Sequence, residues 1–364
     1  MTMSSIRSIL ANSSNRSSVI GVIRIAAMAA TLLLPLTATA EPVTLKLSFF
    51  TSDRSVAYQT AVKPFVDAVN SEGEGLLKID VYPSGALGKV QRDLPKQVLD
   101  GIADIAFIVP GQNPELFPDN AVVELPGLFR NSYEASMTYT RLVAINALAG
   151  YRDFFVIGAF ATQPETIHSR KPTRSLADLR EQKIRANNPT EAIALAKLGA
   201  LPIVLAFNET APAISAGTLD GATVPVTQLF DVGIGRLTSN HYLLGTSVAP
   251  LTLMMNRKVF ERLPENAKAL VRKYSGEWAA IQFSEAYETV GKKTIDDIRA
   301  DARRSIVVPS AQDQLTAQRT FRSIAQDWAA ASVHNGDLLK LTEASLAKVR
   351  EAEAAKARAE VPKE

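Results

Sequence analysis

Histidines, acids and glycines are the residues that could carry catalysis or hold a metal ion, and here they fall into no known pattern. The chain has no cysteine, which excludes a disulfide framework and thiolate metal sites. Its three histidines, His168, His241 and His334, match no metal-ligand spacing, and each is expected to be a surface residue or a satisfied core residue. Gly233-Ile234-Gly235 lacks the further glycine and the lysine of a phosphate loop, and no Gly-x-Ser-x-Gly segment is present.

Carboxylates are abundant but have no recognisable acid–base context. The chain has 37 aspartates and glutamates, so pairs of acids occur throughout it without marking a site. This absence of catalytic patterns favours a binding protein over an enzyme, and no cofactor is expected. A secreted hydrolase or lyase with an unrecognised site is the alternative from a different class.

The first forty residues predict an export signal. They begin with a positive segment that contains no acidic residue and three arginines, Arg7, Arg16 and Arg24. Residues 25–36 are almost wholly apolar, and Ala38-Thr39-Ala40 is the small-x-small pattern that a signal peptidase requires. The apolar run is shorter than the about 20 residues that span a bilayer, although an N-terminal anchor is the alternative. We expect cleavage after Ala40 and a periplasmic protein without a lipid anchor.

Removal of this segment changes the charge of the protein. The whole chain has a formal net charge of +3, and loss of the three N-terminal arginines makes basic and acidic residues equal in number. No basic patch then suggests nucleic acid or an anionic membrane as a partner. The about 320 residues that remain exceed the size at which one core keeps growing, so two domains are expected in what is predicted to be a monomer.

Apolar periodicity after residue 41 alternates between strands and helices. Residues 43–50, 76–82 and 103–109 have the patterns of strands. Residues 57–70 and 93–100 have apolar side chains at helical spacing. This order predicts an α/β architecture in which helices pack on mostly parallel sheets.

The same alternation continues through the rest of the chain. Further strands are expected at residues 155–160, 183–186, 219–224, 251–256 and 305–308. Further helices are expected at residues 175–179, 190–198, 209–216 and 312–331, the third of them capped by Asn208. Residues 265 to about 302 contain no proline and predict one long helix that runs along both domains. From Leu341 on, the composition predicts a solvated helix or a frayed tail.

Six separated segments, in order, resemble one family. They are YPSGALG (82–88), QVLDGIADIA (97–106), LPGLFR (125–130), KP with SLADL and KIR (171–185), FNE with GTLDG (207–221) and NRKVFERLP (256–264). Together they are similar to the motifs of the solute-binding proteins of tripartite ATP-independent periplasmic (TRAP) transporters, the dicarboxylate-binding (DctP-like) family. Each motif alone is weak, whereas six of them in the family's order are a specific signal.

The resemblance implies a two-lobed periplasmic-binding-protein clamp of the type II kind, with a long helix spanning both lobes. Residues 41–162 and 251–288 would form the first lobe, residues 163–250 and 289–340 the second, and residues 341–364 a charged C-terminal tail. Such a clamp binds a small organic acid and delivers it to the permease subunits of a TRAP transporter, which an ion gradient drives. A sensor or an ATP-driven importer is the alternative partner, because the fold does not choose between them.

The resemblance also implies which residues bind the ligand. Arg185 of the KIR segment would bind the ligand carboxylate, because a guanidinium is a planar fork that makes two parallel hydrogen bonds to it. The alternative is a surface arginine paired with Glu181 or Asp178. Phe207 would pack against the ligand or else in the core, and Asn187, with its neighbour Asn188, would bind ligand oxygens or cap the next helix.

The first lobe should contribute residues from the ends of its strands. These candidates are Phe50, Thr51, Ser52, Val109, Gly111 and Gln112. Asp53 and Arg54 are alternatively expected to pair with each other at the rim of the cleft.

Two departures from the family pattern predict the character of the ligand. Many members carry a ligand-contacting asparagine where this chain has Val224, next to Thr223, and a polar ligand end there would lose about 1–3 kcal/mol. Members of the sialic-acid type have a second arginine at about the position of Glu165. We therefore expect a monocarboxylate with an apolar or aromatic body, 2-oxo and 2-hydroxy acids included.

Overall fold

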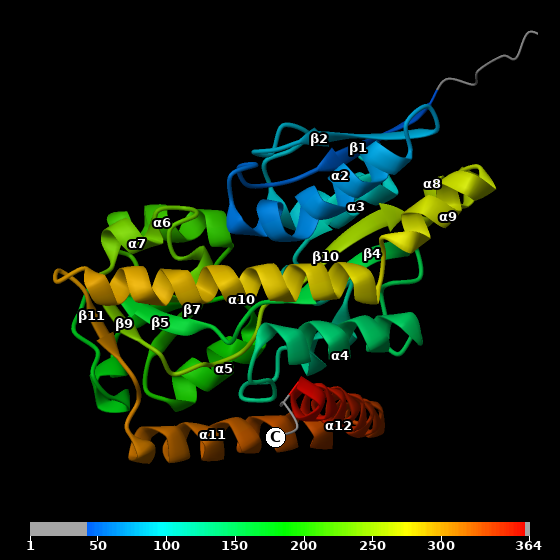
Figure 1. The fold of residues 1–364 in the computed structure, drawn as a ribbon. Coiled ribbons are helices and arrows are strands. Elements are labelled where there is room, and N and C mark those ends of the chain that lie inside the picture. The colour runs from blue at the N-terminus through cyan, green and yellow to red at the C-terminus, as the bar shows by residue number, and fades with distance from the viewer. Residues whose placement is uncertain (1–41, 361–364) are drawn as a thin grey trace, which may run out of the picture. The chain divides into compact units, whose positions relative to one another are not determined.

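The computed structural model describes residues 42–360, so the predicted signal peptide and its cleavage after Ala40 lie outside the described residues. Two mixed sheets organise this part of the chain (Figure 1). The five-stranded sheet has the order β2-β1-β3-β10-β4, with β1 Val43–Ser48, β2 Leu77–Tyr82, β3 Ile105–Ile108, β4 Phe154–Ala161 and β10 Pro250–Asn256. The six-stranded sheet has the order β11-β9-β5-β8-β6-β7, with β5 Thr166–Ser169, β6 Lys183–Ala186, β7 Leu201–Val204, β8 Gly221–Val224, β9 Asn240–Tyr242 and β11 Ser305–Val307.

One strand in each sheet runs against the others. In the first sheet β10 is antiparallel to β3 and β4, whereas β1 pairs in parallel with β2 and β3. In the second sheet β5 is antiparallel to β8 and β9, whereas β6 is parallel to β7 and β8, and β11 to β9. The prediction of mostly parallel sheets flanked by helices is confirmed. We call each sheet, with the helices that pack on it, the first and the second lobe.

Helices cover the sheets. The α-helices are α2 Lys63–Glu72, α3 Leu94–Leu99, α4 Ser132–Ala144, α5 Pro189–Lys197, α6 Phe207–Ser215, α7 Ile234–Leu237, α8 Arg257–Arg262, α9 Glu265–Lys273, α10 Glu277–Ala300, α11 Ala311–Ala330 and α12 Val333–Glu360. Shorter turns are the π-helix η2 Tyr58–Val62 and the 3₁₀ helices η3 Gln91–Asp93, η4 Pro110–Gln112, η5 Pro118–Val122, η6 Leu176–Leu179 and η7 Val226–Gln228. Among residues 42–360, no helix has both the length and the apolar composition needed to cross a membrane.

The first sheet is buried on both faces, as the unbroken apolar run of β3 requires. Ile105 and Phe107 point into a core cluster with residues of α2, α9 and α10. Ala106 and Ile108, which alternate with them, point into a second cluster with residues of α3 and α4. The strand therefore ends deep in the molecule, where its next residues can reach the space between the lobes.

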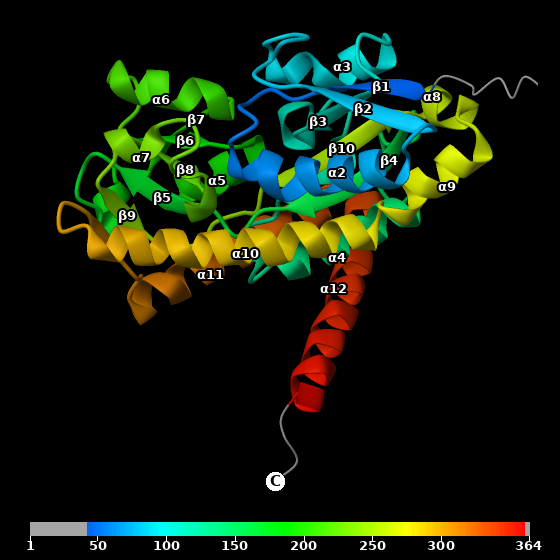
Figure 2. The same cartoon turned by 45° about the horizontal axis from the view of Figure 1, so that its top comes forward.

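The long helix is α10, and it is shorter than the sequence predicted. The expected single helix from residue 265 to about 302 is broken into α9 and α10 at Gly276, whose φ of 65° lies outside the helical region. Glycine tolerates this conformation at little steric cost, so the chain can turn there. Phe283 of α10 lies in the core of the first lobe and Ile298 in a core of the second. The helix thus spans both lobes (Figures 1 and 2).

The C-terminal segment differs from the prediction. Residues 341–364 were expected to be a charged tail and residues 289–340 part of the second lobe, but α12 begins at Val333 and packs on the first lobe. Leu338 and Leu346 are buried in a core of that lobe, because their spacing places them on one face of the helix. The Nη2 of Arg350 lies 2.9 Å from the Oε2 of Glu134 on α4. Beyond this contact the helix projects from the body (Figure 2).

Candidate ligand-binding site

A pocket lies between the two lobes and is lined by residues of both. The space enclosed by its walls, mouth included, is about 450 Å³. Its apolar lining includes Phe50, Phe107, Val109, Phe207, Val224 and Leu251. Its polar lining consists of Thr51, Gln91, Glu165, Arg185, Asn187, Gln228 and Asp231. Apolar walls with a few convergent polar groups are typical of a site for a small organic molecule.

Strand β6 positions Arg185 at the pocket. Ile184 and Ala186 point into the core between the second sheet and α5, so the residue between them points to the opposite face. Arg185 is only 1% exposed, which is unusual for an arginine and requires compensating partners. The central position of β6, between β7 and β8, explains this burial.

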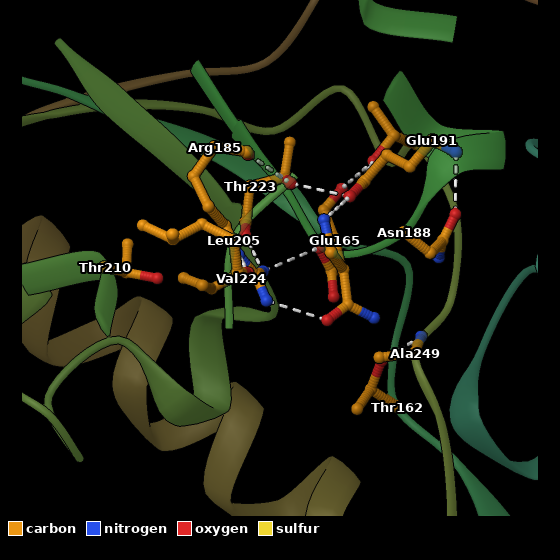
Figure 3. Close-up of polar contacts among 12 residues, drawn as sticks. Thr162, Glu165, Arg185, Asn188, Glu191, Leu205, Thr210, Thr223, Val224 and Ala249 are labelled. Carbon is orange, nitrogen blue, oxygen red and sulfur yellow. Dashed lines mark hydrogen bonds and ion pairs between the residues drawn. The ribbon is translucent and has the colours of Figure 1, made fainter. Parts of the chain in front are cut away.

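Three acceptors fix the guanidinium of Arg185 (Figure 3). Its Nε donates to the carbonyl oxygen of Leu205 and its Nη1 to that of Thr223, both at 2.9 Å. Its Nη2 donates to the Oδ1 of Asn187 at 2.7 Å. Because a guanidinium has five N–H donors, N–H groups remain on Nη1 and Nη2 for another acceptor.

Two buried glutamates accompany this arginine. The Oε2 of Glu165 lies 3.8 Å from the Nη1 of Arg185, and Glu165 is 2% exposed. Glu191 accepts from the backbone N–H of Asn187 at 2.8 Å and from the hydroxyls of Thr223 at 2.7 Å and Thr246 at 2.5 Å. Two acids around one arginine therefore make this region rich in negative charge.

Burial and charge shift the pKa values of this group. Burial raises the pKa of Glu165 well above its usual range, the charge of Glu191 raises it further, and Arg185 opposes both. Burial lowers the pKa of Arg185, while Glu165 and Glu191 raise it. A guanidinium remains protonated in proteins, so Glu165 is the member of this ion pair that can gain or lose a proton.

Asp231 brings the two lobes together at the other side of the pocket. It follows η7 of the second lobe, and its Oδ2 accepts a hydrogen bond of 3.0 Å from the N–H of Val56 in the first lobe. Burial raises its pKa to about 7, against the lowering effect of this hydrogen bond. Gln112 of the first lobe makes a second link, because its Nε2 donates to the carbonyl oxygen of Asn187.

Comparison with known proteins gives the family. The family model of the bacterial extracellular solute-binding proteins, family 7 (DctP), matches residues 47–331. This chain belongs to that family. Its members and structural neighbours bind solutes, so the protein is a TRAP solute-binding protein and not an enzyme.

Four relatives illustrate the similarity, two of them compared with this chain by structure and two by sequence. A TRAP solute-binding protein of Rhodoferax ferrireducens T118, in complex with copurified benzoate, is 25% identical, with a TM-score of 0.79 over 85% of this chain and 99% of that one. A marine-metagenome TRAP protein specific for aromatic acid ligands, in complex with metahydroxyphenylacetate, is 25% identical, with a TM-score of 0.78 over 84% and 99%. The C4-dicarboxylate-binding periplasmic protein DctP of Rhodobacter capsulatus is 27% identical over 70% of this chain and 77% of its own. For another curated solute-binding protein, from Verminephrobacter eiseniae, the chain spans 62% of the relative's length.

Most of the sequence-predicted residues of this solute-binding protein line the pocket. They are Phe50, Thr51, Val109, Arg185, Asn187, Phe207 and Val224. Arg185 is buried, so the alternative of a surface arginine paired with Glu181 or Asp178 is wrong. Phe207 is the first residue of α6, whose N-cap is Ala206 and not the predicted Asn208.

Four predicted residues lie outside the pocket lining. Ser52 is in an exposed turn, where its hydroxyl contacts the carboxylate of Asp53 and the N–H of Arg54. Thr223 lies behind Arg185 and supplies it with a carbonyl acceptor. These two residues face away because a turn and a strand pleat, respectively, direct their side chains elsewhere.

The other two predicted residues, Gly111 and Gln112, lie at the junction between the lobes. Gly111 fits close to Glu124, since a Cβ there would meet its Oε1 at 1.9 Å. Gln112 lines a neighbouring depression and links to Asn187 across the junction. Asn188 caps α5 by accepting from the N–H of Glu191 at 2.8 Å, which settles its role as a cap.

Several residues of the pocket lining were not identified from the sequence. Gln91, Gln228 and Asp231 come from loops and 3₁₀ turns that carry no motif. Glu165 was noted only as a departure from the family's arginine, and that position was the one available signal that it lies at the site.

Two of the three histidines meet in the core. His168 of β5 pairs in register with His241 of β9, and their Nδ1 atoms are 2.7 Å apart. Burial lowers the pKa of His168 well below its usual range and that of His241 to about 4, so both rings are neutral at pH 7. Both are therefore core residues with hydrogen-bond partners, which was one of the two alternatives expected from the sequence. Within residues 42–360, no group of three or more potential ligands could hold a metal ion.

Proposed function

We propose that this solute-binding protein captures a small monocarboxylate with an apolar or aromatic body and delivers it to a TRAP permease. One observation carries the proposal: a buried arginine with unused N–H groups lies in a pocket walled by three phenylalanines, Phe50, Phe107 and Phe207. A desolvated guanidinium strengthens a carboxylate contact, and aromatic walls stabilise a flat apolar body.

The composition of the pocket supports the same ligand class. Val224 offers no hydrogen bond where many family members are expected to have an asparagine, and Glu165 places a carboxyl where a second arginine would favour another anionic group. The benzoate and metahydroxyphenylacetate held by the two structural neighbours have the proposed chemistry, since each has one carboxylate and one aromatic ring. A second carboxylate on the ligand would meet no second cation in the pocket lining, where the other ionisable groups are Glu165 and Asp231.

The capture mechanism follows from the position of the pocket between the lobes. An open form exposes Arg185, and a ligand that contacts both lobes favours the closed form by its differential affinity. The links from Val56 to Asp231 and from Gln112 to Asn187 stabilise that closed form. Delivery to the ion-driven permease then follows from the closed form docking on it, which the family membership supports.

The test is calorimetric titration of the mature protein with a panel of acids. Benzoate, 3-hydroxybenzoate and mandelate are expected to bind with micromolar or tighter affinity, equivalent to about −8 kcal/mol. Malate and sialic acid are expected to bind at least tenfold more weakly. Preference for malate or sialic acid over all the aromatic acids would contradict the proposed ligand class.

A further inference from the structure

Glu165 lies where the chain passes from the first lobe to the second, and two backbone hydrogen bonds hold it there. Its N–H donates to the carbonyl oxygen of Ser247 at 2.7 Å, and its own carbonyl oxygen accepts from the N–H of Thr246 at 2.8 Å. Two of the chain segments that pass between the lobes are therefore joined at this residue. The carboxyl of Glu165 consequently lies in the pocket at a fixed position beside Arg185.

The carboxyl of Glu165 has a polar atom without a partner. Its Oε2 is buried and makes no hydrogen bond to the described residues. At 3.8 Å from the Nη1 of Arg185 it is in ion-pair range but too far for a hydrogen bond. A buried polar atom left unpaired destabilises the structure, so a ligand group that satisfies it would add affinity.

A second buried acid lies close to Glu165. Glu191 of α5 accepts hydrogen bonds from one backbone N–H and from two threonine hydroxyls. Tyr287 of α10 is also near, and burial raises its pKa well above the usual range, with the charge of Glu165 adding to this effect. Among residues 42–360, Arg185 of β6 is the cation that pairs with Glu165. Two acids therefore share one cation in this region.

A ligand carboxylate at Arg185 would add a third carboxylate to this group. Next to an ionised Glu165 it would be repelled, whereas a protonated Glu165 could donate a hydrogen bond to it. Carboxyl pairs that share one proton in this way are a known consequence of two like charges at one site. The burial and charge that raise the pKa of Glu165 favour the same protonated form.

We propose that Glu165 is a specificity-determining residue that takes up one proton from solvent when a ligand monocarboxylate binds at Arg185, and then donates a hydrogen bond to that carboxylate. This inference rests on the proposed function. It requires the affinity for a carboxylate to fall as pH rises, because the bound state holds one more proton than the free state. The limiting slope is a tenfold loss in affinity for each pH unit.

The test uses calorimetric titrations of benzoate from pH 6 to pH 9, where an acid with a pKa of about 4 is fully ionised. For the natural protein, the affinity is expected to fall at least tenfold across this range. Titration at pH 8 in buffers with different ionisation enthalpies is expected to show net proton uptake on binding. Glu165→Gln keeps a donor but cannot titrate, so it should match the natural protein at pH 6 within about twofold. At pH 9 it should bind at least tenfold more tightly.

Two matched variants separate the effect of Glu165 from that of the other acids whose pKa values are raised. Glu124 is fully buried and has a pKa raised by burial to about 8, yet it is not part of the pocket lining. Asp231 lines the pocket and has a pKa of about 7. Glu124→Gln should not show the tenfold gain at pH 9, whereas Glu165→Gln should still show it in an Asp231→Asn background, where the second pocket acid that titrates in this range is absent.

The outcomes distinguish this inference from the proposed function. Benzoate affinity that depends on Arg185 but not on pH would overturn the role of Glu165 and leave the function standing. A pH dependence that survives in Glu165→Gln would also overturn it. Benzoate affinity that increases with pH would also contradict the proposal, because binding would then release a proton instead of taking one up. Failure of every organic acid to bind at any pH would overturn the proposed function itself.

Discussion

The two sides of the pocket are built differently. The second lobe contributes the charged and hydrogen-bonded groups, with Arg185 and Asn187 joined to Glu191 in one buried network. The first lobe contributes mainly rings and aliphatic chains, among them Phe50 and Phe107, whose centroids are 6.1 Å apart. Under the proposed function, the groups that recognise charge would be assembled within one lobe before closure, whereas the other lobe would supply shape and exclude water.

The largest effect is expected from a substitution within the polar network of the second lobe. Glu191→Gln replaces one of the two carboxylate oxygens that together accept three hydrogen bonds with an amide nitrogen, so at least one donor loses its acceptor. A buried donor left without a partner costs about 1–3 kcal/mol. Chemical denaturation should therefore show a loss of stability of this size.

The matched control is Glu261→Gln, which changes an exposed glutamate on α8. It should alter the free energy of unfolding by less than about 0.5 kcal/mol. If the two variants lose equal stability, Glu191 does not hold the network together, and the second lobe is not preorganised as described.

A smaller effect is expected on the apolar side. Phe207→Ala removes one aromatic ring from the wall of the pocket. The lost ring contact is worth about 0.5–1.5 kcal/mol, which is a roughly two- to tenfold loss in the affinity for benzoate. Affinity for acetate, which has no ring, should change less than twofold. Phe155→Ala is the control, because Phe155 stacks on Phe260 at 3.8 Å and is not part of the pocket lining. Equal losses for acetate and benzoate would show that Phe207 acts through the fold and not through the ring of the ligand.

Local patterns predicted the elements that carry the charge network. Strand β6 has the predicted bounds because alternation of apolar and polar side chains is clear over residues 183–186. The buried strands of the first sheet were equally visible, since continuous apolar runs mark strands covered on both faces. The position of Arg185 in the pocket follows from this strand and from the family motif that contains it.

Elements defined by tertiary contacts could not be predicted. β7 and β9 are short, and β7 is an edge strand whose side chains are largely exposed, so neither has a distinct apolar period. The helix α12 looked like a solvated tail because Ala, Glu, Lys and Arg dominate its composition, and its few buried residues, such as Leu346 and Val349, form one narrow face. The break at Gly276 depends on one backbone angle that an otherwise helical sequence does not reveal.

The same limit applied to the site. Asp231 and Gln91 reach the pocket from loops that are remote in sequence, so only the packing of the lobes brings them there. Glu165 was visible as an unusual residue at a family position, but its closeness to both Arg185 and Glu191 depends on three separate elements. Sequence reasoning could therefore give the charge that the site recognises but not the acids that surround it.

The central claim is that Arg185 binds the carboxylate of the ligand. Calorimetric titration of benzoate into Arg185→Ala, with the exposed Arg319→Ala of α11 as the matched control, tests it most directly. Circular dichroism and thermal unfolding should first show that both variants are folded. The account predicts that Arg185→Ala binds at least tenfold more weakly while Arg319→Ala is unchanged. Unaltered affinity in a folded Arg185→Ala would contradict it.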